Sequence, residues 1–160
     1  MGKITGINAE MKRLEAEIER LEKEAVADTK VAAITVVKAM HSRTPVWTGE
    51  AVRNFTVGIG SRNNSKAPGG PQPPPGSTPK GLGGEQNRAS MESGSLSAAN
   101  SALNKLKDLD KNVIVSNTVD AAKWDLLDNG SAPTRERARN PGGISALAIQ
   151  GARAKLTNWK

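Results

Sequence analysis

The chain contains no cysteine and no tyrosine, and its 160 residues include one histidine, one phenylalanine and three tryptophans. The lack of cysteine excludes disulfides and thiolate metal sites, and a single histidine has no second His or Cys with which to bind zinc. The core must therefore be built mainly from aliphatic side chains. The hydrophobic share, 36%, is below that of a typical compact enzyme. These values favour a thin protomer that completes its burial against neighbours, together with a large part that does not fold alone.

Long hydrophobic runs are also missing. No purely apolar run is longer than VAAI at residues 31–34, which is far below the roughly 20 residues that a membrane-spanning helix needs. The opening residues, MGKITGINAE, lack the apolar segment of a signal peptide. We therefore expect a protein that is made and kept in a cytoplasm, or packed into a particle there, and we expect no membrane partner.

The net charge of +7 is spread along the chain without a run of one sign. Residues 1–41 balance, whereas residues 42–107 carry eight basic against three acidic groups. A basic excess is typical of proteins that meet nucleic acid or an acidic partner surface. An ordinary solvated surface accounts for it equally well.

Apolar residues near the N-terminus follow a heptad spacing, alternately four and three residues apart, which marks one face of a helix. They are Ile7, Met11, Leu14, Ile18 and Leu21, followed by Ala25. The pattern predicts one helix over about 8–41, which at about 1.5 Å per residue would be roughly 50 Å long. Because such a helix is long for a chain of this size, we expect its first half to project and to pack on another subunit. The alternative is an amphipathic helix folded back on its own core.

The remaining segments predict an α+β fold in a single domain over residues 1–160. Alternation of Phe55, Val57 and Ile59 predicts a strand over 53–60. A Pro/Gly-rich arm over 61–88 could order on a neighbour or stay disordered. The remainder, 89–160, contains a predicted helix, strand, short helix and C-terminal helix, at 95–109, 112–117, 119–130 and from Ile144 onwards.

Two strands do not make a stable sheet on their own. The predicted small antiparallel sheet, packed by helices, therefore needs at least one strand beyond the two that the sequence pattern predicts. Either further strands lie within 85–95 or 131–142, or neighbouring subunits complete the sheet.

No enzyme signature is present, so we expect no catalytic residue, no cofactor and no metal. His41 stands alone, and a lone His at a helix end is far more often a structural or solvated residue than a catalytic base. No Gly-rich segment has the spacing of a phosphate-binding loop. Arg135, Arg137 and Arg139 alternate in one charged stretch and could contact phosphate. Glu136 lies among them, and a salt-bridging loop at a subunit boundary explains the three arginines equally well.

The segment TPVWTGEAVRNFTVGIG, residues 44–60, resembles the signature of phage tail-completion (neck) proteins, including the minor tail proteins of lambda-like phages. The matching residues are Thr44, Pro45, Val46, Thr48, Gly49, Arg53 and Asn54. A later block, GSLSAANSALNKLKDLDKNVIVSN, resembles the helix of that family and its following strand that ends in Asn. WDLLDNGSAP resembles a further element, through Leu127, Asp128, Gly130 and Ser131. Trp47 and Asp128 depart from the family pattern, which has Asp and Glu there, and the arm is longer than usual.

The resemblance implies a non-enzymatic structural virion protein that forms a ring at the head–tail junction. The expected homo-oligomer has six or twelve copies, with the portal (connector) protein on one face and the tail tube or tail terminator protein on the other. Lumenal DNA is a further candidate partner, and the location would be the virion neck after assembly in the host cytoplasm. The candidate interface residues, besides the stripe on the first helix, are Trp47, Thr48, Arg53, Trp124, Asp128, Arg135, Arg137 and Arg139.

Some of these residues have a simpler explanation. Core packing accounts for Trp47 and Trp124 as well as an interface does, since the chain has few aromatic residues. Two other functions remain open: a basic nucleic-acid-binding accessory protein, and a coiled-coil adaptor that oligomerises through residues 7–25.

Overall fold

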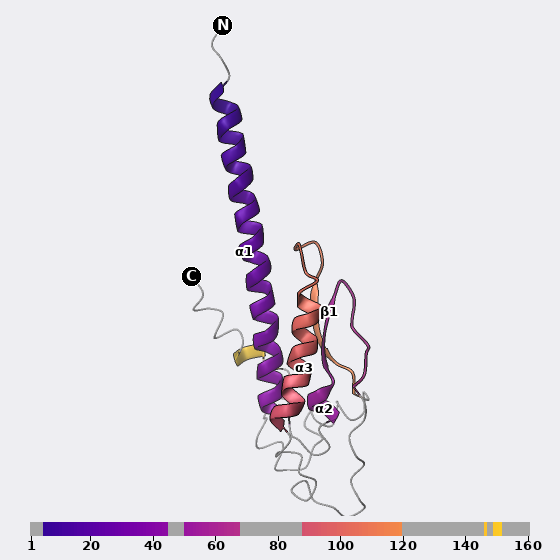
Figure 1. Cartoon of the computed structure of the whole chain (residues 1–160). Coiled ribbons are helices and arrows are strands. Elements are labelled where there is room, and N and C mark those ends of the chain that lie inside the picture. Colours follow the sequence, from indigo (N-terminus) through magenta and orange to yellow (C-terminus); the bar gives the residue numbers. More distant parts are fainter. Residues whose placement is uncertain (1–4, 45–49, 68–87, 120–145, 147–148, 152–160) are drawn as a thin grey trace, which may run out of the picture.

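The computed structural model describes residues 5–44, 50–67, 88–119, 146 and 149–151. The predicted α+β class is confirmed: a long N-terminal helix and a small antiparallel sheet packed against helices (Figure 1). In chain order the elements are α1 (Thr5–Arg43), α2 (Glu50–Arg53), β1 (Phe55–Ile59), α3 (Arg88–Leu103) and β2 (Val113–Asn117). The predicted short helix over 119–130 and most of the predicted C-terminal helix lie outside the described residues.

Helix α1 spans 39 residues, slightly beyond the predicted 8–41. From Ile7 to Arg43 the sequence has neither Gly nor Pro, so nothing in its interior breaks the hydrogen-bond ladder. The helix ends at a capped C-terminus. The Thr44 hydroxyl donates to the Met40 carbonyl at 2.8 Å, and the Arg88 guanidinium donates to the carbonyls of His41 and Thr44 at 2.8 and 3.0 Å. These bonds satisfy carbonyls that a helix end otherwise leaves without partners.

The two strands pair antiparallel, with Phe55 opposite Asn117 and Ile59 opposite Val113. Strand β1 is shorter than the predicted 53–60 because the preceding residues form the single turn α2. All five residues of strand β2 are half-buried. In the described part of the chain β2 pairs with β1 alone, so its second edge has no strand neighbour there.

The core lies between the C-terminal half of α1, helix α3 and one face of the sheet. Its buried members are mostly aliphatic, as the scarcity of aromatics predicts: Ala33, Val37, Met40, Phe55, Val57, Ala99 and Leu103. On α1 the first buried residue is Val26. The preceding half of the helix contributes nothing to this core.

Helix α3 begins earlier and ends earlier than the predicted 95–109. The predicted alternative of a strand within 85–95 is wrong for residues 88–95, which are helical. Ser95, where the predicted helix begins, lies in the middle of α3 and is buried. After Leu103 the chain tightens through bonds from Lys105 N to Ala102 O and from Leu106 N to Leu103 O. These bonds end the helix while still burying Leu106.

The first part of the predicted 61–88 arm folds over the outer face of β1. The Thr56 hydroxyl donates to the Asn63 carbonyl at 2.9 Å, the Thr118 hydroxyl donates to the Ser65 carbonyl at 2.9 Å, and the Ala67 amide donates to Asn54 Oδ1 at 2.8 Å. Residues 61–67 therefore pack on their own chain. Residues 68–87 lie outside the described part, so the rest of the arm stays a prediction.

Candidate interaction surface

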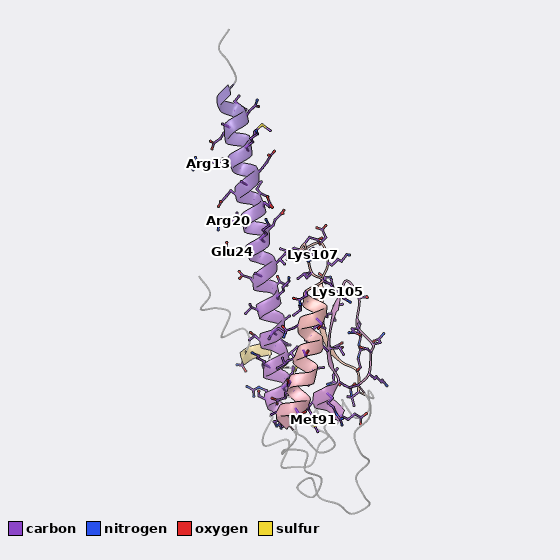
Figure 2. The ribbon with its side chains drawn as sticks, in the orientation of Figure 1. Arg13, Arg20, Glu24, Met91, Lys105 and Lys107 are labelled. Atoms are coloured by element: carbon purple, nitrogen blue, oxygen red, sulfur yellow. The ribbon has the colours of Figure 1, made fainter. Side chains whose placement is uncertain are left out.

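The N-terminal half of α1 projects away from the rest of the described structure (Figure 1). Every residue from 6 to 24 is exposed, and the first half-buried one is Ala25. The side chains of this half point outward with no other element beside them (Figure 2). The prediction that this half projects is confirmed, and the alternative of a helix folded back on its own core is wrong for this segment. Which molecule packs on it stays a prediction.

All five predicted stripe residues lie on the projecting half and are exposed. The exposed fractions are 59% for Ile7, 53% for Met11, 56% for Leu14, 55% for Ile18 and 50% for Leu21. Scattered single hydrophobic residues are normal on a surface, but a continuous row on one helix face marks an interaction site. We call this row, Ile7, Met11, Leu14, Ile18 and Leu21, the apolar stripe.

Ion pairs stabilise the helix between the stripe residues. Arg20 bonds Glu17 at 2.7 Å and Glu24 at 3.0 Å, and Lys23 bonds Glu19 at 2.6 Å. Arg20 lowers the pKa of the Glu17 carboxyl through a hydrogen bond and through its charge, and Lys23 does the same for Glu19. Pairs this exposed add little to stability. They favour the helical conformation locally, because residues three and four apart are neighbours on the helix surface.

A buried polar relay lies where α1, α3 and β1 meet. His41 is 1% exposed, and its Nε2 lies 3.1 Å from Ser95 Oγ. Since the Ser95 hydroxyl donates to the Phe55 carbonyl at 2.9 Å, its oxygen must accept from His41, which assigns the proton to Nε2. The Phe55 ring meets the His41 ring edge-to-face at 5.2 Å. These hydrogen bonds connect α1, α3 and β1 through Ser95.

Burial lowers the pKa of His41, and the positive charge of Arg88 lowers it further, while Glu92 and the backbone of Val52 oppose the shift. The imidazole is therefore neutral near pH 7. Its Nδ1 has no hydrogen-bond partner in the described structure. The ring is enclosed, so His41 is part of the packed interior and is not solvated.

Two asparagines, one just before β1 and one at the end of β2, bind the backbone of α2. Asn54 Nδ2 donates to the Glu50 carbonyl and Asn117 Nδ2 to the Ala51 carbonyl, both at 2.7 Å. The two residues also join neighbouring segments, since Asn54 O accepts from the Thr118 amide and Asn117 O from Arg62. These asparagines therefore hold the junction between α2 and the sheet together. Composition alone did not indicate this role.

The remaining candidate residues fall into two groups. Arg53 is half-buried in α2 and takes part in interactions within the structure, so it is not simply displayed to solvent. The others lie outside the described residues and stay predictions: Trp47, Thr48, Trp124, Asp128, Arg135, Arg137 and Arg139.

Within the described ranges, no group of three or more His, Asp or Glu side chains is arranged to hold a metal ion. None of the helices described here is both long and apolar enough to cross a bilayer. An open hollow follows one face of α3 from Ala89 to Asn104. Since α3 and the residue that follows it supply all of the lining, no second element closes over the hollow.

No family model, no curated protein and no solved structure matched the chain. Function has to be inferred from its own residues and geometry.

Proposed function

We propose that this protein is a structural component of a tailed-phage virion that forms a ring at the head–tail junction and joins the portal to the tail. The observation that carries the proposal is the order of three elements along the chain. A long helix runs into TPVWTGEAVRNF, a helix and a strand ending in Asn follow, and WDLLDNGSAP comes next. Each motif is weak alone, but together and in this order they resemble neck proteins.

The geometry of α1 supports an assembly role. A ring requires each protomer to present two different surfaces that match its neighbours. This protein has two such surfaces, the projecting half of α1 and the body formed by the other described elements. The projecting half packs against no other described element, so its surface is open to a neighbour. The exposed apolar stripe offers apolar surface that a partner in the assembly can bury, since nothing in the described part of its own chain covers it.

The nucleic-acid alternative has less support in the described part. The projecting residues 6–24 contain four basic and six acidic side chains, so the most prominent element is not a phosphate-binding surface. The net positive charge comes from elsewhere, including the arginines at 135, 137 and 139.

Mass measurement and negative-stain imaging of the purified protein would test the proposal, first alone and then mixed with tailed particles that lack it. Rings, or a monomer that attaches only to the particle neck, would support it. A monomer that ignores particles but binds DNA tightly at physiological salt would overturn it in favour of the nucleic-acid alternative.

The three arginines give a second test of the same proposal. If they face lumenal DNA, changing Arg135, Arg137 and Arg139 together to Gln should impair DNA retention and leave rings intact. Loss of the rings would instead place these residues at a subunit contact.

A further inference from the structure

The charges beside the apolar stripe restrict what can dock on it. In heptad terms Met11 and Ile18 occupy a positions, and Ile7, Leu14 and Leu21 occupy d positions. The flanking e and g positions are Asn8, Glu10, Glu15, Glu17, Glu22 and Glu24. Five of these six are glutamates, and none is basic. The four basic side chains of this segment, Lys12, Arg13, Arg20 and Lys23, all occupy positions away from the seam.

This arrangement opposes pairing of the stripe with the same stripe of a second copy. In a parallel pair, g residues face e residues of the partner helix, so Glu10 would meet Glu15 and Glu17 would meet Glu22. In an antiparallel pair, g faces g and e faces e, which again sets glutamate against glutamate. Like charges at these positions destabilise an interface and exclude the wrong partner.

The two sides of the seam differ in how far their charge is already neutralised. On the g side, Glu17 and Glu24 both bond Arg20, and Figure 2 shows Arg20 and Glu24 on the same stretch of the helix. On the e side, Glu15 and Glu22 make no ion pair within the described residues. The e side therefore has free carboxylates for a cationic partner.

We infer that the apolar stripe docks an amphipathic helix of a different protein, one whose apolar seam is flanked by Lys or Arg. Such a helix buries the stripe and pairs its cations above all with the free carboxylates of the e side. The described part of this chain offers no such helix, since the apolar residues of α3 are in its own core. The inference specifies the chemistry of one partner in the proposed assembly, but it depends only on the apolar stripe and the charges of α1. It can hold even if the virion proposal fails.

The test uses the full chain and two fluorescent peptides of residues 5–28. One has the native sequence. The other carries E10K, E15K, E17K, E22K and E24K, with R20E to keep the intrahelical pairs. Both retain the same apolar seam, so the two peptides differ only in charge. We expect the charge-reversed peptide to bind the chain at least about tenfold more tightly than the native one, with an affinity that falls as salt rises.

Variants of the full chain locate the binding. Leu14→Asp should abolish binding of the charge-reversed peptide, whereas Ala16→Asp, the matched change on the opposite face of α1, should not. Glu15→Lys with Glu22→Lys should weaken it, since the e-side carboxylates are then replaced by cations. Circular dichroism should show equal helix content in all three variants.

Three results would overturn the inference. One is equal binding of the two peptides, and another is no binding of either. The third is self-association of the chain at neutral pH that Leu14→Asp dissolves and Ala16→Asp does not, since that would make a second copy the occupant. None of these measurements involves particles or rings, so their outcome is separate from the test of the virion proposal.

Discussion

At the scale of single residues, His41 shows how a lone histidine in this chain belongs to the fold. It donates to Ser95, which in turn donates to the Phe55 carbonyl, so one side chain of α1 is tied to both α3 and β1. Burial makes this arrangement dependent on the neutral imidazole, because a charged ring would have to give up its hydration. The effect should therefore appear in how stability depends on pH.

We expect the free energy of unfolding to fall as the pH drops below about 6.5, the ordinary pKa of histidine. In the folded protein the pKa of His41 is lowered, so between the two values the unfolded chain binds more protons than the folded one. The stability that depends on neutral His41 is fully present above about pH 6.5 and is lost on acidification. His41→Gln keeps a donor for Ser95 but does not titrate. Urea unfolding at pH 7.5 and 5.5 should show a smaller loss in this variant, and equal losses would contradict the assignment.

At the scale of elements, β1 is covered on both faces, by the core on one side and by residues 61–67 on the other. Its residues Phe55 to Gly58 are therefore all buried, although alternation predicts one exposed face. Gly58 makes the outer contact possible. A side chain there would fall on the Ser61 carbonyl oxygen and lie 2.8 Å from the Asn63 amide nitrogen. Because both neighbours are backbone atoms, they cannot move aside cheaply.

Gly58→Ala should therefore displace residues 61–67 and destabilise the protein by roughly 1–3 kcal/mol, the usual cost of overpacking. Amide hydrogen exchange should lose protection at Ala67, whose N–H bonds Asn54. Gly94→Ala is the matched control, since a side chain at this helical position meets open space. It should stabilise by about 0.5–1 kcal/mol, as expected for alanine in a helix. Similar effects of the two changes would show that residues 61–67 do not constrain Gly58.

The success of prediction differed among elements for physical reasons. Helix α1 could be predicted because its apolar residues keep a regular spacing and no Gly or Pro interrupts them. Helix α3 was placed too late because RASMESGS holds small polar residues and a glycine, and its helical state depends on tertiary contacts such as that of Ser95 with Phe55. The stripe could likewise be found from spacing. The hydrogen bonds of Asn54 and Asn117 could not, because their partners are backbone atoms that only the fold brings near.

At the scale of the whole molecule, one helix serves two environments. The C-terminal half of α1 is part of the core, while the N-terminal half carries an apolar stripe that faces solvent. A row of large hydrophobic side chains is normally buried when a protein folds, but this row stays exposed. An assembly component would have this property, because the apolar face of the N-terminal half of α1 would be buried only when a partner binds. The same substitution made in each half distinguishes the two roles.

Leu103→Ala and Leu14→Ala remove the same atoms from opposite environments, one side chain being 2% exposed and the other 56%. Truncation at Leu103 should cost about 2–5 kcal/mol, because it leaves a cavity against α1 and β1. Truncation at Leu14 should change stability by less than about 0.5 kcal/mol, as for most surface positions. Urea unfolding at several protein concentrations measures both. A large, concentration-dependent loss for Leu14→Ala would mean that copies of the chain already cover the stripe in solution, and the docking face would then belong to the protein's own oligomer.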